Sequence, residues 1–207
     1  MTDFGFYLVI TNPAVGYAKC AEAAVRAGVR IVQLRMKHAR REDIVREGRE
    51  MRRVTAGTDT LFIVNDDPSI AADVEADGVH VGQGDMAPRD VRSAYPDLGI
   101  VGLSTHNLAQ VRASVLEPVD YIGVGPVYAT PTKDIPDPTL GLATMGEMIT
   151  AAGRPAVAIG GIDAMRLPDV AAAGARNFAV VRAVCSSPDP YSEIRRLQDI
   201  FADSGTQ

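Results

Sequence analysis

The segment "RAGVRIVQLR", residues 26–35, joins an alanine-rich stretch to an apolar run through a glycine. Two other segments repeat this arrangement, "EADGVHVGQ" at 75–83 and "AAGARNFAVV" at 172–181. A glycine that ends a helix just before a buried strand is typical of the turn from helix to strand in α/β proteins. The three junctions therefore predict a chain in which helices and strands alternate.

Short apolar runs rich in valine and isoleucine recur along the chain, and most are apolar on both faces, as in parallel strands covered by helices. The expected strands are 6–11, 31–36, 61–66, 78–83, 100–105, 121–127, 156–161 and 177–183. Helical periodicity is visible at 42–55, 107–116 and 189–205. Eight such units predict a (β/α)8 TIM barrel of the α/β class, with an open doubly wound sheet as the alternative.

The composition limits the class of protein. A length of 207 residues without an internal linker suits one domain, expected to span 1–207. The net charge of −5 argues against a nucleic-acid surface, and no apolar stretch approaches a membrane span. The N-terminus lacks the pattern of a signal peptide. With only Cys20 and Cys185, far apart in sequence, we expect reduced, buried cysteines in a cytoplasmic protein.

Polar residues concentrate where the expected strands end, and in a barrel those ends meet at one mouth. They include Gln33, Arg35, Lys37, Asn65, Asp66, Asp67, Gln83, Asp85, Ser104, Thr105, His106, Thr130, Thr132, Lys133, Gly160, Gly161 and Arg182. The opposite ends of the same strands show no such concentration. This asymmetry predicts a ligand site at the C-terminal mouth.

Two of these groups suit anions. Gly160 and Gly161 follow a strand and precede an expected helix, so their backbone N–H groups could bind a phosphate, although a tight turn also uses glycine. Gln33, Arg35 and Lys37 alternate, which places them on one side of an extended strand. Two cations and an amide suit a diphosphate, and a salt-bridged barrel interior is the other interpretation.

Asp66 and Asp85 follow neighbouring strands, and paired carboxylates near phosphates suit Mg²⁺. Either residue alone is more often a helix cap or a turn, and 67–69 is expected to be such a cap.

The remaining candidates carry weaker signals. Ser104 lies in no nucleophile elbow, so an anion donor or a helix cap suits it better than a nucleophile. His80 lies within a strand and is expected to be a hydrogen-bonded core histidine. His106 begins an expected helix and is a weak candidate for a general base.

The chain also carries longer motifs that, in this order, resemble the thiamine-phosphate synthase family. The matching motifs are "VQLRMK", "FIVNDDPSIAADVEADGVHVGQGDM", "VGLSTHN", "DYIGVGPVYATPTKD", "PAVAIGGI" and "FAVVRAV". The resemblance implies a barrel transferase of thiamine biosynthesis that joins a hydroxymethylpyrimidine diphosphate to a thiazole phosphate. Its products are thiamine monophosphate and pyrophosphate, and its cofactor is Mg²⁺.

The resemblance also implies roles for residues at matching positions. The pyrimidine diphosphate would be held by Gln33, Leu34, Arg35, Met36, Lys37 and Asn65, with Ser104 and Lys133 on its diphosphate. The thiazole phosphate would be held by Thr130, Pro131, Thr132, Gly160, Gly161, Val181 and Arg182. Asp66 and Asp85 would bind Mg²⁺, and Arg35, Lys37, Ser104 and Lys133 would be catalytic. The partners implied are these two small molecules, with no nucleic acid or membrane and with a homo-oligomer possible.

The chain departs from the family pattern at three positions. The family often has glutamate at the position of Met36 and arginine at that of Asp67, and usually serine at that of Arg182. These departures leave a catalytically silent ligand-binding relative open, and a thiazole tautomerase-like barrel isomerase is the second alternative. The segment 128–140, with three prolines and Lys133, is interpreted as a lid that closes on the substrates.

Overall fold

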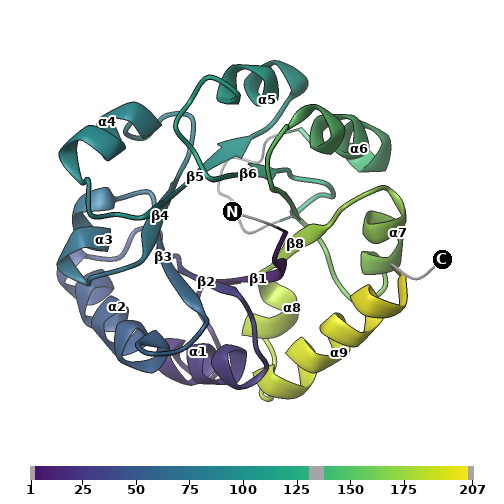
Figure 1. Cartoon of the computed structure of the whole chain (residues 1–207). Helices are drawn as coiled ribbons and strands as arrows, with labels where there is room; N and C mark the ends of the chain where they lie inside the picture. Colours follow the sequence, from purple (N-terminus) through teal and green to yellow (C-terminus); the bar gives the residue numbers. More distant parts are fainter. Residues whose placement is uncertain (1–2, 131–137, 205–207) are drawn as a thin grey trace.

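The computed structural model describes residues 3–130 and 138–204. Within them, eight parallel strands close into a barrel in the order β1 to β8, with β8 paired to β1 (Figure 1). Helices surround the barrel on the outside (Figure 1). The predicted TIM barrel is therefore confirmed, and the open sheet was the wrong alternative because the edge strands pair with each other.

Each predicted strand is present, but most end earlier than expected. The strands are β1 (Gly5–Ile10), β2 (Ile31–Leu34), β3 (Leu61–Asn65), β4 (Gly78–Val81), β5 (Ile100–Thr105), β6 (Tyr121–Val124), β7 (Ala156–Ile159) and β8 (Asn177–Val180). The predictions ran too far because the apolar and glycine residues after several strands belong to the loops of the mouth. The expected strand at 177–183 even includes the start of a helix.

The helices follow the strands in turn. They are α1 (Tyr17–Arg26), α2 (Arg41–Thr55), α3 (Pro68–Asp73), α4 (Pro88–Ala94), α5 (Leu108–Ser114), α6 (Gly141–Ala151), α7 (Leu167–Ala172), α8 (Arg182–Cys185) and α9 (Pro190–Ser204). The predicted cap at Asp67 is confirmed, and Asn107 caps a second helix. Asp67 accepts the backbone N–H groups of Ser69 and Ile70, and Asn107 accepts that of Gln110.

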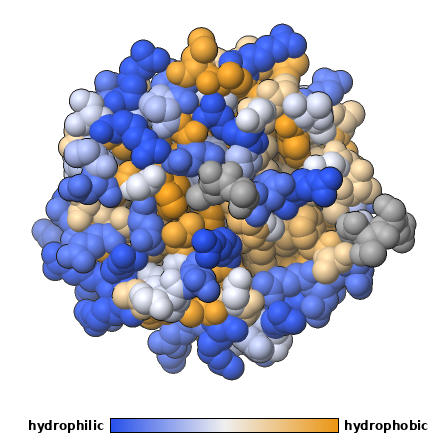
Figure 2. All heavy atoms as spheres, in the orientation of Figure 1, coloured by the Kyte–Doolittle hydropathy of each residue, from blue (hydrophilic) through white to orange (hydrophobic). Residues whose placement is uncertain are grey.

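Two hydrophobic layers hold the barrel together. Alternate residues of β1 show the division, since Phe6 and Leu8 pack outward against the helices while Tyr7 and Val9 point into the barrel. The inner layer consists of Tyr7, Val9, Ile31, Ile63, Tyr121, Val157 and Ala179. On the surface, Figure 2 shows hydrophilic residues mainly along the left and lower edges of the view, with hydrophobic residues near the centre and at the upper edge. No helix of the described residues is long and apolar enough to cross a membrane.

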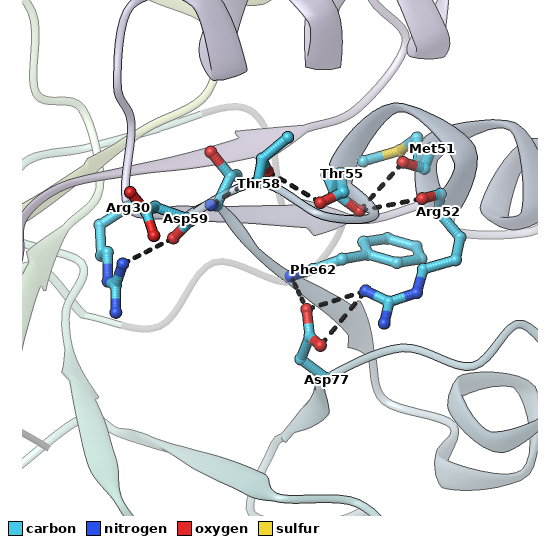
Figure 3. A network of polar contacts seen from close by, with 9 residues as sticks. Arg30, Met51, Arg52, Thr55, Thr58, Asp59, Phe62 and Asp77 are labelled. Carbon is cyan, nitrogen blue, oxygen red and sulfur yellow. Dashed lines mark hydrogen bonds and ion pairs between the residues drawn. The ribbon is translucent and has the colours of Figure 1, made fainter.

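The N-terminal ends of the strands form a closed polar layer. Asp77, just before β4, accepts the backbone N–H of Phe62 at 2.7 Å and the Arg52 guanidinium at 3.1 and 3.2 Å (Figure 3). Asp120, just before β6, repeats this arrangement with the N–H of Val101 at 2.7 Å and with Arg92 at 2.5 Å. Asp77 thus ties β3 to α2, and Asp120 ties β5 to α4, so each aspartate joins the preceding strand to the helix that comes before that strand.

The two cysteines come together although they are distant in sequence. Cys20 of α1 and Cys185 of α8 are both buried. A hydrogen bond with the Cys185 sulfur, followed by burial, raises the pKa of the Cys20 thiol. The expected burial is confirmed, and the contact joins the first helix to the short helix at the mouth.

Candidate active site

A cavity of about 210 Å³ opens at the C-terminal ends of the strands. Predicted site residues from six different strands or loops line it, namely Gln33, Arg35, Asn65, Ser104, Thr130, Gly160, Gly161, Val181 and Arg182. Tyr7, His80, His106, Tyr121 and Arg166 line it as well. Because these residues lie far apart in the chain, their shared cavity is the convergence that the strand ends predicted.

A chain of hydrogen bonds forms the floor of this cavity. The amide of Gln33 donates to the Tyr7 hydroxyl at 2.7 Å, and the hydroxyls of Tyr7 and Tyr121 lie 2.9 Å apart. His80 continues the chain, with Nδ1 3.1 Å from the Tyr121 hydroxyl and Nε2 2.9 Å from Ser104 Oγ. His80 is therefore hydrogen-bonded within the barrel, as expected, but it also faces the cavity.

Burial sets the chemical state of the two tyrosines. It raises the pKa of Tyr7, and it raises the pKa of Tyr121 well above its usual value of 10.0. Both hydroxyls are therefore neutral at physiological pH and act as hydrogen-bonding groups. Their positions in apolar strands gave no sequence signal, because a tyrosine in such a run is usually core.

Gly102 makes room for the floor. A Cβ at this position would lie 2.2 Å from Cζ of Tyr121 and 2.5 Å from Nδ1 of His80. Such distances are far inside van der Waals contact, so any larger residue would displace the pair. The glycine in the "VGLS" run is thus required by packing against the hydrogen-bond chain.

Asp66 and Asp85 lie at the rim, beside the cavity and outside its lining. Lys37 Nζ pairs with Asp66 Oδ2, and the Gly82 N–H donates to Asp85 Oδ2 at 2.7 Å. Desolvation raises the pKa of the Asp85 carboxyl, and the nearby Asp66 carboxylate raises it further. The predicted pairing of these aspartates across β3 and β4 is therefore present.

The donor set of this pair fits a hard divalent cation. Two adjacent carboxylates repel each other, and a cation between them would relieve that repulsion. Among the residues described by the structure, no group of three or more His, Cys, Asp or Glu could hold a metal. Mg²⁺ commonly uses one or two carboxylates and completes its shell with water and substrate oxygens, so two aspartates suffice.

The opposite end of the cavity is shaped for an anion. Gly160 and Gly161 have φ values of 107° and 64°, which disfavour any other residue. A Cβ at Gly161 would lie 2.8 Å from both the Ala129 carbonyl oxygen and Cβ of Tyr128. Arg182, the first residue of α8, adds a cation at the same end of the lining. The predicted glycine pair is thus fixed by its backbone conformation and by close packing.

Arg166 was not anticipated from the sequence. Its Nη1 donates to the Gly161 carbonyl at 2.7 Å, and its guanidinium carbon lies 4.8 Å from the centre of the Tyr128 ring. An arginine at the start of a predicted surface helix carries no signal of its own. Only the fold of the β7–α7 loop brings it to the cavity.

Two of the predicted substrate-binding side chains point elsewhere. Leu34 is 1% exposed and belongs to the layer between the strands and the helices, and Met36 packs against that same layer. Alternation along β2 turns Gln33 inward and therefore Leu34 outward. β2 ends at Leu34, so the alternation invoked for Lys37 stops before it, and Lys37 reaches the rim rather than the cavity. The Leu34 and Met36 side chains lie outside the cavity lining, so a role of these two positions in substrate binding would fall to their backbone groups and stays a prediction.

His106 lines the cavity with one ring nitrogen fixed as a donor, so its role as a general base stays a prediction. Its Nδ1 lies 2.6 Å from the Gly125 carbonyl oxygen, so Nδ1 carries a proton. The following helix begins at Leu108, after the Asn107 cap, rather than at His106. Pro131, Thr132 and Lys133, and most of the predicted lid, lie outside the described residues.

The fold and this cavity define the class of protein. A TIM barrel whose mouth holds a glycine turn with arginines at one end, and paired carboxylates at the other, is built as an enzyme for small phosphorylated molecules. Residues 6–184 match the family model described as thiamine monophosphate synthase. The chain belongs to the thiamine monophosphate synthase family.

Individual relatives agree with the family. A thiamine-phosphate synthase of Synechococcus is 43% identical over 87% of this chain, and that of Xanthobacter autotrophicus is 40% identical over 95% of this chain and 94% of its own length. The match covers 51% of the Synechococcus relative, so the chain spans about half the length of that protein. The structure of a thiamine phosphate pyrophosphorylase from Pyrococcus furiosus superposes with a TM-score of 0.88 at 27% identity, covering 98% of this chain and 97% of the other.

Proposed function

We propose that this protein is a transferase that condenses 4-amino-2-methyl-5-(diphosphooxymethyl)pyrimidine with thiazole phosphate to give thiamine monophosphate and pyrophosphate. The observation that carries the proposal is the shared cavity. In a chain of this family, it joins the polar floor at Gln33 and Ser104 to the glycine turn at Gly160 and Gly161. The floor suits a heteroaromatic ring with an amino group, and the turn suits a phosphate.

Binding of the diphosphate falls to the cations at the β2 end of the mouth. Arg35 lines the cavity, and Lys37 lies at the rim against Asp66. We assign Mg²⁺ to Asp66 and Asp85, where the ion would supply neutralisation of phosphate charge. Lys133 is assigned to the same diphosphate from the family resemblance alone.

The reaction needs the chain to hold two partners and a leaving group. The bond between the pyrimidine methylene carbon and the diphosphate oxygen breaks, and both electrons leave with the diphosphate. Arg35, Lys37 and the Ser104 hydroxyl offset the charge that develops on it. The thiazole nitrogen then donates its lone pair to the methylene carbon, so the new C–N bond forms without loss of a proton. This step therefore needs no general base.

Water must stay away from the carbocation-like methylene group. Val9, Val157 and Ile159 give the cavity apolar walls between its two polar ends. Such walls position the two rings and leave few sites for a competing water molecule. The cavity therefore favours attack by the thiazole over hydrolysis.

The test is a pyrophosphate-release assay with the purified protein. With both substrates and Mg²⁺ we expect thiamine monophosphate and pyrophosphate in equal amounts, and we expect neither after EDTA treatment until Mg²⁺ is restored. A barrel isomerase would act on a thiazole substrate indifferently to EDTA. A silent ligand-binding protein would bind both substrates in calorimetry without turnover, and either outcome would replace the proposal.

We also propose that the protein acts in the cytoplasm on its two small-molecule substrates, without a nucleic-acid or membrane partner. The net charge of −5 supports the absence of a nucleic-acid surface. A homo-oligomer stays a prediction, which light scattering of the purified protein would test.

A further inference from the structure

We propose that the hydrogen-bond chain under the cavity has one fixed direction, so that His80 carries its proton on Nε2 and Ser104 presents its hydroxyl proton to the cavity. Tyr7, Tyr121 and His80 are then positioning residues that set the hydrogen-bonding roles of Gln33 and Ser104. The direction of the chain follows from the structure alone. Its value for catalysis rests on the function proposed above.

Two residues that face the substrate cavity, 71 positions apart in sequence, are linked by three intervening residues. These three residues have their hydrogen-bond partners without any substrate. Gln33 and Ser104 form the ends, on β2 and β5, and the intervening groups are 2.7 to 3.1 Å apart. Tyr7 is 2% exposed and Tyr121 is 0% exposed, so water does not compete for these hydroxyls. The network therefore behaves as one connected unit.

The direction is set at the Gln33 end. The Nε2 group of Gln33 can only donate, so the Tyr7 oxygen accepts from it. The Tyr7 proton then needs an acceptor, and within the described residues the Tyr121 oxygen provides it at 2.9 Å. The Tyr121 proton in turn goes to Nδ1 of His80 at 3.1 Å.

The His80 tautomer follows from the same sequence of bonds. A neutral imidazole that accepts at Nδ1 carries its proton on Nε2. That proton points to Ser104 Oγ at 2.9 Å, so the serine oxygen accepts from His80. The hydroxyl proton of Ser104 is consequently directed away from His80, and the Ser104 side chain lines the cavity.

The reverse direction would leave a buried hydroxyl proton without an acceptor. If Ser104 donated to His80 and Tyr121 donated to Tyr7, the Tyr7 oxygen would accept from both Tyr121 and Gln33. Its own proton would then have no acceptor among the described residues, and an unpaired buried hydroxyl costs about 1–3 kcal/mol. The proposed direction gives both buried tyrosine hydroxyls an acceptor.

Packing holds the rings of the hydrogen-bond chain in place. The rings of His80 and Tyr121 stack with centroids 5.4 Å apart and 27° between planes, and Tyr7 meets Tyr121 edge-on at 5.8 Å. Gly102 leaves the space that the stacked pair occupies. Rings held in this way keep the same oxygen and nitrogen atoms facing one another, so the direction of the chain depends only on where the protons lie.

The two ends of the chain therefore offer complementary chemistry. Ser104 offers a donor, which suits an anionic oxygen, and Gln33 keeps its Oε1 available as an acceptor, which suits an amino group. A ligand with an anionic group on one side and an amino-substituted ring on the other matches this polarity. We infer that the network orients the pyrimidine substrate before the bond to its diphosphate breaks.

The first test measures the tautomer directly in the substrate-free enzyme. The chain has 3 histidines, so ¹⁵N labelling of histidine gives few signals, and His80→Gln identifies that of His80 by its loss. At neutral pH we expect a proton on Nε2 and none on Nδ1. A proton on Nδ1, alone or together with Nε2, would overturn the proposal.

Gln33→Glu sharpens this test. The carboxylate oxygen can accept from Tyr7 but cannot donate to it, so the chain should reverse and move the His80 proton to Nδ1. An unchanged tautomer in this variant would show that Gln33 does not set the direction.

The second test asks whether the network works as a unit. Tyr7→Phe and Tyr121→Phe each remove one hydroxyl without a large change in volume, and each should lower kcat roughly tenfold with the KM for thiazole phosphate unchanged. The double variant should lose about the same factor as either single variant, since one break already interrupts the chain. Independent structural roles would instead multiply to a loss of about a hundredfold and would overturn the proposal. Tyr191→Phe, whose ring lies against Arg26, is the matched control and should leave kcat unchanged.

The two proposals fail in different ways. If the wild-type protein releases no pyrophosphate, the proposed function fails while the tautomer measurement still stands. If pyrophosphate is released but His80 carries its proton on Nδ1, the function stands and this inference fails.

Discussion

The two ends of the barrel use the same residue types for different purposes. At the base, Asp77 and Asp120 each accept a backbone N–H and an arginine. At the mouth, Asp66 faces Lys37, and Asp85 accepts one backbone N–H beside the Asp66 carboxylate. The aspartates of the base have their hydrogen-bond partners within the protein, whereas the mouth places two carboxylates side by side.

Burial does not distinguish these ends. The side chains of Asp77, Asp120 and Asp66 are 26%, 28% and 30% exposed, so their solvation is nearly equal. The difference lies in the neighbours, because each aspartate of the base has its own arginine, whereas Asp66 and Asp85 lie beside each other with Lys37 as the shared cation. This pairing of carboxylates is the reason for proposing a divalent cation at the mouth.

Removing a carboxylate at the mouth should have the largest effect on the reaction. For Asp66→Ala and for Asp85→Ala we expect a loss in kcat of roughly a hundredfold or more, because the Mg²⁺ site is lost. The thermal unfolding temperature should change little. Steady-state pyrophosphate release over a range of Mg²⁺ concentrations measures the first quantity and calorimetry the second. Near-wild-type rates for both variants would refute the metal assignment.

Removing a carboxylate at the base should do the opposite. Asp77→Ala leaves the Phe62 N–H and the Arg52 guanidinium without their acceptor, which should cost about 2–3 kcal/mol of unfolding free energy. The value of kcat at saturating substrate should be retained. Urea unfolding followed by circular dichroism measures the loss, and Asp120→Ala is the matched variant at the repeated site. A stable but inactive Asp77→Ala protein would break the distinction between the ends.

Arg166 belongs to the mouth by position, and its guanidinium donates to the backbone carbonyl of Gly161. If it binds the thiazole phosphate, Arg166→Ala should raise the KM for that substrate roughly tenfold, since a charged hydrogen bond is lost. The KM for the pyrimidine diphosphate should stay the same. Arg89 lies on α4 and pairs with Glu117. The variant Arg89→Ala removes this ion pair and serves as a control that should change neither KM. Equal KM changes for both substrates would instead assign Arg166 to the shape of the β7–α7 loop.

The smallest expected effect is a gain in stability. Asp85→Asn keeps an acceptor for the Gly82 N–H but removes the repulsion from Asp66, so without Mg²⁺ it should raise the unfolding free energy by less than about 1 kcal/mol. Adding Mg²⁺ should stabilise the wild type and not the variant. Thermal scans with and without Mg²⁺ measure both effects. A destabilised variant in the absence of Mg²⁺ would mean that the Asp85 charge has a structural partner.

Part of the site was readable from the sequence because strand ends in a parallel barrel converge whatever the loops do. That rule placed Gln33, Arg35, Asn65 and Ser104 around one cavity before any coordinates. The roles of Tyr7 and Tyr121 were not readable, since a buried tyrosine in an apolar strand looks like core until its hydroxyl partners are known. The side chains of Leu34 and Met36 do not line the cavity because a matched motif names neighbours in sequence, while alternation along β2 sends adjacent side chains to opposite faces.

By itself, the sequence determined the alternation of helices and strands and the family, and it favoured a barrel that the pairing of β8 with β1 then showed to be closed. Local signals carry these, namely apolar runs, glycine turns, caps and long motifs. Only the tertiary structure decided which side chains face one another across the barrel, including the Gln33 to Ser104 chain, the Asp66 and Asp85 pair, and Arg166 on Gly161. Such contacts depend on strand register and loop geometry, which are fixed when the whole core packs and leave no trace in any single segment.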